Sequence, residues 1–117
     1  MYSAAFIFEP GVYDAQFKTL DALIEEAAQA IPGYLGVDWW QSADGFRNNA
    51  VYYWETQESL RAFSVHPKHL EAKRQYTQWY KGFHIVISQV LHSYGDGMIA
   101  HITPNQRAPD MTRRSTD

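Results

Sequence analysis

Two histidines three residues apart are the side chains of this sequence best suited to chemistry. His66 and His69 lie about one helical turn apart if the backbone between them is helical. Histidine has an ordinary pKa of about 6.5, so His69 can take a proton from a ligand near neutral pH, and we assign it as the candidate catalytic residue. His66 is a candidate pocket residue. The alternatives are that His66 caps a helix beginning at Pro67, and that His69 is an interior residue bonded to a backbone carbonyl or a tyrosine.

The same pair raises the question of a metal site. Such a site needs a third ligand, for example His84, His92 or a carboxylate, and no acidic metal-binding motif accompanies the pair. We therefore expect no metal ion here. The sequence also lacks the glycine-rich loops that bind phosphates and dinucleotides, and we expect no cofactor.

A lysine and several aromatic residues complete the candidate site. Lys73 follows His69 by four residues on the same helical face, where it either attracts an acidic or phenolic ligand or is an ordinary surface lysine. The other pocket candidates are aromatic: Trp40, Tyr53, Trp54, Phe63 and Tyr76. The alternative for Tyr76 is the hydrophobic core, and the sequence leaves open which sheet face each strand residue takes.

The aromatic content supports a cavity or an interface. The chain has 117 residues, enough for one domain, and 15% of them are aromatic: four Trp, eight Tyr and six Phe. A small core needs fewer large rings for packing alone, so we expect some of them to line a cavity or a contact between subunits.

The elements that must position these side chains follow from the hydrophobic pattern. Short apolar or alternating runs predict strands at residues 4–8, 34–42, 49–55 and 83–94. Apolar spacings of three and four predict one helix between Asp14 and Pro32, and a helical region over residues 56–80 interrupted at Pro67. The last strand should be covered on both faces for most of its length.

In the first helix, the pattern places Phe17 and Ile24 on the buried face. The acidic residues Asp21 and Glu25 are assigned to the other, polar side of the helix.

The order strand, helix, strand, strand, helix, strand predicts an α+β fold of the ferredoxin-like βαββαβ type. Right-handed crossovers then place the helices on one face of a four-stranded antiparallel sheet. The other face carries apolar side chains and needs a cover, so we expect an obligate homodimer. The folded domain should span residues 1–95, followed by a polar C-terminal tail over residues 96–117 that is partly ordered or packed on the partner subunit.

Composition excludes several classes of partner. The net charge of −3 argues against nucleic-acid binding, and the absence of cysteine excludes disulfides and thiolate chemistry. No apolar stretch approaches the ~20 residues of a membrane span, and the N-terminal residues do not resemble a signal peptide. We expect a cytoplasmic protein without a membrane or nucleic-acid partner.

One segment of the sequence resembles a known family. Residues 53–63 read YWETQESLRAF, and residues 66–72 continue as HPxHLxA. With Trp79-Tyr80 and the final Tyr94-Gly95, this pattern resembles the antibiotic biosynthesis monooxygenase domain of the dimeric α/β-barrel superfamily. The resemblance covers residues 4–95. It implies the βαββαβ fold, a face-to-face dimer that completes the barrel, and a ligand cleft in each subunit between helices and sheet.

The resemblance also implies a choice of functions. The family includes cofactor-independent oxygenases of quinols and polyketide phenols, and heme-degrading enzymes. The heme-degrading pattern has an Asn on the first strand, a Trp on the second helix and a His ten residues later. Here the first strand has no Asn, and Phe63 and Lys73 occupy the other two positions. We therefore expect a cofactor-independent monooxygenase of small electron-rich aromatic molecules, with a non-catalytic dimeric ligand-binding or stress-related module as the alternative. Heme binding or degradation is a less favoured third reading.

Overall fold

The protein consists of a four-stranded sheet and three helices. Its structure, a computed structural model, describes residues 1–107; residues 108–117 of the predicted tail lie outside the described part. The elements in chain order are β1 (Tyr2–Pro10), α1 (Ala15–Ala30), β2 (Tyr34–Gln41), β3 (Asn48–Trp54), α2 (Gln57–Ser64), α3 (Pro67–Trp79) and β4 (Tyr80–Gln89). None of the helices in the described residues has the length and hydropathy that a membrane span requires.

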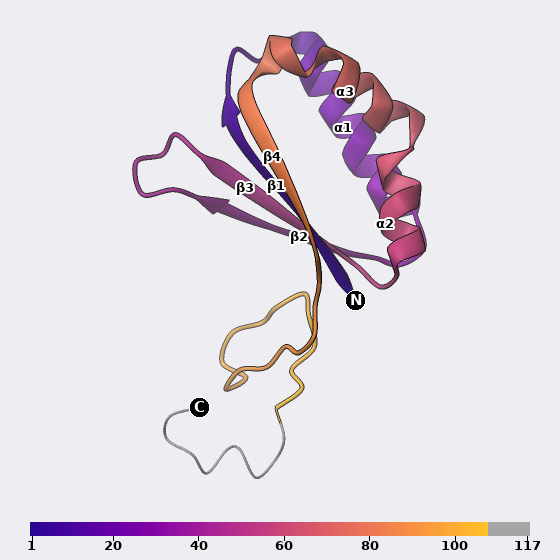
Figure 1. The fold of residues 1–117 in the computed structure, drawn as a ribbon, viewed down its shortest axis with the longest axis vertical. Helices are drawn as coiled ribbons and strands as arrows, with labels where there is room; N and C mark the ends of the chain where they lie inside the picture. The colour runs from indigo at the N-terminus through magenta and orange to yellow at the C-terminus, as the bar shows by residue number, and fades with distance from the viewer. Residues whose placement is uncertain (108–117) are drawn as a thin grey trace.

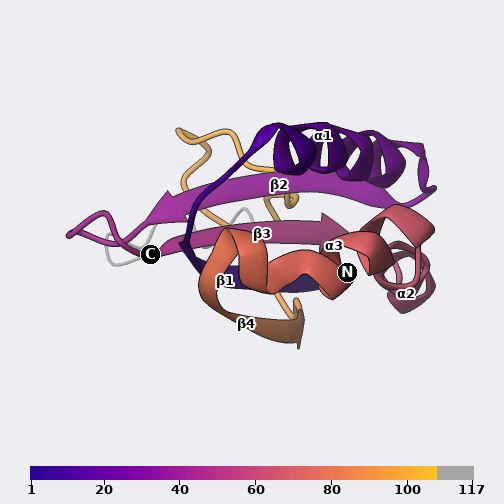
Figure 2. The same ribbon diagram turned by 90° about the horizontal axis from the view of Figure 1, so that it is seen from above.

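The sheet is antiparallel throughout, with the strand order β2-β3-β1-β4 (Figure 2). All three helices lie on one side of it (Figure 1). The predicted α+β ferredoxin-like fold is therefore confirmed. The side of the sheet away from the helices is called the open face below.

Alternation along the strands decides which side chains face the helices. Phe6 of β1 lies opposite Ala50 of β3 and Ile85 of β4, so these three residues share one face. The residues of β2 and β3 on the helix side are Val37, Trp39, Ala50, Tyr52 and Trp54. Those on the open face are Asp38, Trp40, Val51 and Tyr53. The two alternating faces expected from the sequence are those observed.

Each helix begins at a side chain that accepts a backbone hydrogen bond. The Asp14 carboxylate accepts from Phe17 N at 2.8 Å, and the Thr56 hydroxyl accepts from Ser59 N at 3.1 Å. His66 Nδ1 accepts from Lys68 N at 3.1 Å, and Pro67 occupies the first turn of α3. These caps fix the three helix starts near the residues that the sequence predicts.

The hydrophobic core lies where α1 and α2 meet β3. Trp54 and Ala28 have no exposed surface, and Leu60 and Phe63 of α2 are 8% exposed. The Trp54 ring lies 5.2 Å from the Phe63 ring. This cluster holds α2 against the sheet and so positions the segment that leads to His69.

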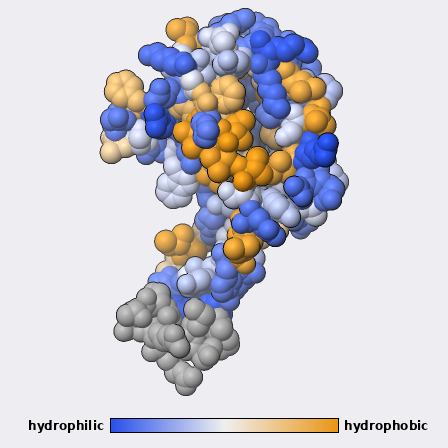
Figure 3. Space-filling view, viewed as in Figure 1, coloured by the Kyte–Doolittle hydropathy of each residue, from blue (hydrophilic) through white to orange (hydrophobic). Residues whose placement is uncertain are grey.

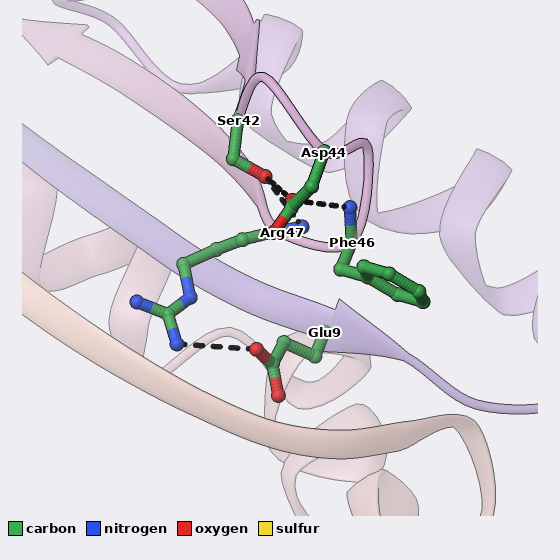
Figure 4. Close-up of polar contacts among 5 residues, drawn as sticks. All are labelled: Glu9, Ser42, Asp44, Phe46 and Arg47. Atoms are coloured by element: carbon green, nitrogen blue, oxygen red, sulfur yellow. Dashed lines mark hydrogen bonds and ion pairs between the residues drawn. The ribbon is translucent and has the colours of Figure 1, made fainter.

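The turn between β2 and β3 forms where Asp44-Gly45 predicts it. The Asp44 carboxylate accepts from the Ser42 hydroxyl at 2.7 Å and from Phe46 N at 3.0 Å (Figure 4). These hydrogen bonds, that of Ser42 first, lower the pKa of Asp44. Arg47 then reaches Glu9 of β1 at 3.1 Å, which ties the hairpin to the neighbouring strand.

The last strand differs from its prediction. β4 begins at Tyr80 and ends at Gln89, which pairs with Tyr2, the first residue of β1, and Val90 N then donates to the Met1 carbonyl oxygen at 3.0 Å. It is an edge strand, and Phe83, Ile85 and Ile87 are 41–52% exposed instead of being covered. Figure 3 shows the resulting apolar patch along β4.

Residues 90–107, called the C-terminal arm, follow β4 and extend away from the helices (Figure 1). His101 Nε2 lies 2.6 Å from the Asp38 carboxylate on the open face of β2. Ile102 packs on Gly36, whose φ is +142° and whose added Cβ would lie 3.1 Å from Ile102 Cδ1. The described part of the predicted tail thus contacts β2 of its own chain, and contact with a partner subunit stays a prediction.

Candidate functional site

A cavity of about 310 Å³ lies between the helices and the sheet. Its volume is at the lower end of the range of small-molecule sites, about 300–1,000 Å³. The wall residues are mostly apolar or aromatic: Ala4, Phe6, Asp21, Ile24, Tyr52, Trp54, Leu60, Phe63, Ser64, His69, Ala72, Lys73, Tyr76, Tyr80, Phe83, Ile85 and Ile87. The exposed β4 residues belong to this wall, so the cavity opens along the sheet edge.

Most of the residues singled out from the sequence meet at this cavity. His69, Phe63, Lys73, Trp54 and Tyr76 all line it. They come from α2, α3 and the end of β3: the core cluster joins α2 to β3, and the stacking of His69 on Phe63 joins α3 to α2.

Three predicted pocket residues lie elsewhere. Trp40 and Tyr53 point to the open face because each alternates with a neighbour on the helix side. Trp40 is 61% exposed, and the Tyr53 ring meets the ring of His101 edge-on at 5.6 Å. His66 caps α3, which was the alternative expected for it.

His69 is a histidine that the protein keeps neutral. Its ring stacks on Phe63 with centroids 4.6 Å apart and an angle of 23° between the planes. Burial, and then the nearby Lys73 ammonium, lower the pKa of His69, although the carbonyls of Ser64 and Phe63 act in the opposite direction. Its Nδ1 atom is buried and has no hydrogen-bond partner among the described residues. A neutral imidazole in the cavity wall can accept a proton.

Lys73 supplies the positive charge beside His69. Its Nζ donates to the carbonyl oxygen of Ser64 at 3.2 Å. Ser64 is the last residue of α2, where the helix dipole favours a cation. The ammonium is therefore held at the cavity wall, close to where a phenolate oxygen would lie if its proton went to His69.

Four polar wall residues are not among the predicted pocket residues: Asp21, Tyr52, Ser64 and Tyr80. Asp21 follows Phe17 by four residues and precedes Ile24 by three, so the spacing itself places it on the apolar face. Asp21 is nevertheless exposed, as expected for a charged residue of the polar face. Burial, and then the charge of Glu25, raise the pKa of Asp21.

The pKa values of the two wall tyrosines, Tyr52 and Tyr80, are both raised. Burial is the main cause that raises the pKa of Tyr52 and Tyr80, and the negative charge of Asp21 adds to it in both. Both phenols are therefore protonated donors at the cavity wall.

Other parts of the described structure offer less chemistry. Among residues 1–107, no three His, Asp or Glu side chains gather closely enough to hold a metal ion. A second, more open depression lies between α1 and α3, but Glu71 is its only ionisable wall residue.

Comparisons with known proteins bear on the fold. No family model matches the sequence, and no curated protein does. Solved structures match well in shape. They include Rv0793 from Mycobacterium tuberculosis, with a TM-score of 0.66 and 16% identity over 80% of this chain and 98% of that one.

Two further structures carry functional names. SnoaB, a cofactor-independent oxygenase from Streptomyces nogalater, matches with a TM-score of 0.63 and 12% identity over 79% of this chain and 94% of its own. A candidate antibiotic biosynthesis monooxygenase from Nitrosomonas europaea matches with a TM-score of 0.61 and 21% identity over 79% of this chain and 100% of its own. The chain therefore has the fold of the antibiotic biosynthesis monooxygenases, the family that its sequence resembles.

Proposed function

We propose that the protein is a cofactor-independent monooxygenase of small electron-rich aromatic substrates, such as quinols or polyketide phenols, bound in the cavity between helices and sheet. The observation that carries the proposal is His69: a half-buried imidazole with a lowered pKa, in a cavity wall of aromatic side chains. SnoaB, which has the same fold, is named a cofactor-independent oxygenase and supports this reaction class.

In this reaction the substrate itself supplies the electrons. With anthrone as the example, His69 takes a proton from the methylene carbon, and the resulting enolate reduces O₂ and bonds to it. The peroxide formed takes the proton back and then loses water, leaving a carbonyl. One anthrone and one O₂ give one anthraquinone and one water, so atoms and electrons balance without another reductant.

The protein's part is to bind, deprotonate and shield the substrate. The aromatic wall suits a flat ring system, and Lys73 stabilises the enolate oxygen. Apolar walls keep water away from the carbanion.

The alternative, a non-catalytic ligand-binding module, predicts a closed and fully packed contact between helices and sheet. The observed cavity, with His69 in its wall, favours the enzyme.

The proposal includes a homodimer located in the cytoplasm. Its support is the open face of the sheet, where Trp40 is 61% and Val86 is 42% exposed in the single chain. Apolar surface of this kind is stabilised when a second sheet covers it.

Oxygen uptake tests the function. The wild-type protein should accelerate O₂ consumption by anthrone or a naphthoquinol above the uncatalysed rate. His69→Ala should lose on the order of a hundredfold or more of that acceleration, the contribution typical of a general base.

His92→Ala is the matched control, because His92 is exposed and lies outside the cavity wall. It should keep the wild-type rate. Equal oxygen uptake in wild type and His69→Ala would remove His69 from the catalytic role.

A further inference from the structure

We propose that the exposed apolar residues on the helix side of β4 bind an alkyl tail of the substrate, so that the protein selects aromatic substrates with an apolar side chain. These residues, Phe83, Ile85 and Ile87, are called the β4 strip below. The inference rests on the proposed function, because it takes the aromatic ring of the substrate to lie in the cavity beside His69. It adds a second part to the binding site and a narrower substrate class.

The β4 strip joins the inside of the cavity to the surface of the molecule. All three of its residues line the cavity, and yet Phe83, Ile85 and Ile87 are 44%, 41% and 52% exposed. They form part of the apolar patch along β4 in Figure 3. A ligand that fills the cavity therefore has apolar protein surface directly outside it, on the same side of the sheet.

The opening of the cavity lies between α3 and β4. α3 continues directly into β4, and the two elements diverge from that junction (Figure 1). Close to the junction the Tyr76 ring of α3 meets the Phe83 ring of β4 edge-on, with centroids 5.0 Å apart, and closes the gap. Ile85 and Ile87 lie farther from the junction. A substituent that leaves the cavity through the opening would lie along these two residues.

The chemistry of the β4 strip suits a hydrocarbon chain. Its three side chains have neither hydrogen-bond donors nor acceptors, so a polar substituent would lose its water there without compensation. Alternate residues of a strand project to the same face, and the strip spans roughly 13 Å at a rise of about 3.3 Å per residue. A narrow apolar track of this length accommodates an extended alkyl chain.

A second subunit on the open face would leave the β4 strip uncovered. Alternation places His84, Val86 and Ser88 of β4 on the open face, opposite to the strip. The dimer proposed above forms through the open face, whereas the strip is continuous with the cavity wall. An apolar ligand in the cavity is therefore the occupant that fits the strip.

Calorimetric titration with 4-propyl-1-naphthol and 4-hexyl-1-naphthol tests the tail site. The two compounds share the ring system and the hydroxyl group and differ by three methylene groups in the tail. Wild-type protein should bind the hexyl compound about eightfold more tightly. This is about twofold for each methylene, equivalent to ~0.4 kcal/mol, or about half of the gain from a fully buried methylene, as expected for a chain that contacts protein on one side.

Variants of the β4 strip should remove this preference. Threonine keeps the branched shape that suits a strand, but it replaces apolar surface with a hydroxyl group. In the double variant Ile85→Thr/Ile87→Thr the ratio should fall below threefold, and in Ile87→Thr alone it should be intermediate. Val86→Thr is the matched control, because Val86 is 42% exposed on the same strand but lies on the open face, and it should keep the eightfold ratio.

The outcomes separate this inference from the proposed function. Equal affinity of wild type for the two naphthols, or an unchanged ratio in the double variant, would overturn the tail site and leave the oxygenase proposal in place. A ratio that depends on the strip, without any oxygen uptake with anthrone, would support the tail site and overturn the oxygenase. A mass of the double variant below that of wild type in light scattering would mean that a second subunit covers the strip, and would overturn the tail site.

Discussion

The surroundings of His69 lower the pKa of its imidazole ring. Stacking on Phe63 buries the ring, and Lys73 adds a positive charge nearby, so both disfavour imidazolium and lower the pKa. The folded-state pKa thus lies below the unfolded value of about 6.5. The stability that neutral His69 contributes is therefore present above pH ~6.5 and is lost as the pH falls through the folded-state pKa.

Removing the lysine charge should move this pKa. In Lys73→Met, the pKa of His69 should rise toward its ordinary value, because the repulsion from the ammonium is gone while burial remains. An NMR titration of the His69 ring proton resonances measures it. Arg74→Met is the control, since Arg74 pairs with Glu71 and does not line the cavity. An unchanged or lower His69 pKa in Lys73→Met would contradict this account.

Whether the sequence could predict that a residue faces the cavity depended on whether the residue lies on a helix or on a strand. On the helices, spacing alone linked His69 to Lys73 and brought both to the cavity wall. On the strands, alternation grouped Trp40 with Asp38 but gave no sign of which group faces the helices. Asp21 is exposed, as its charge predicts, although its position between Phe17 and Ile24 also brings it to the cavity wall.

At the scale of elements, the start of α2 links the sheet to the site. The Thr56 hydroxyl caps the helix, and Ser59 bonds to the carbonyl oxygen of Pro32 at 2.6 Å, just before β2. From this start α2 carries Leu60 and Phe63 into the core. The cap therefore fixes the position of the residue on which His69 stacks.

Loss of that cap should destabilise the fold. Thr56→Ala should lower the free energy of unfolding by about 1 kcal/mol, because Ser59 N loses its partner. Urea denaturation measures the change. Thr56→Ser keeps a hydroxyl at the cap and should retain most of the wild-type stability. Equal destabilisation in both variants would mean that the threonine methyl group, and not the cap, accounts for the effect.

The ends of helices and strands could be predicted from the sequence where a nearby capping residue or proline determines them. Asp14, Thr56 and Pro67 mark helix starts through hydrogen bonds within a few residues. The end of β4 was not predictable in this way, because the apolar pattern continues to Tyr94. It depends on a distant partner, since Tyr2, which pairs with Gln89, is the first residue of β1.

At the scale of the whole molecule, the helices cover one face of the sheet and leave the open face without a cover of its own (Figure 1). The fold could be predicted from the order of elements and the handedness of the crossovers. What covers the open face cannot be read from one chain, because the same alternation serves a dimer, a ligand or the C-terminal arm. His101 and Ile102 of the arm cover part of β2.

Light scattering after size-exclusion chromatography tests the dimer. The wild-type protein should elute at about twice its 13.5 kDa chain mass at micromolar concentration. Trp40→Glu places a charge on the open face and should shift the mass toward one chain. Val12→Glu, at an 80% exposed apolar residue before α1, should remain dimeric. A wild-type mass of one chain would rule out the dimer.

The central claim is that aromatic ligands bind in the cavity between helices and sheet, beside His69. The most direct test is an NMR titration of the ¹⁵N-labelled protein with 1-naphthol, following the indole N–H signals of Trp54 in the cavity wall and Trp40 on the open face. We predict that the Trp54 signal shifts with saturation and that the Trp40 signal does not. A saturable shift of Trp40 with Trp54 unchanged would contradict the claim.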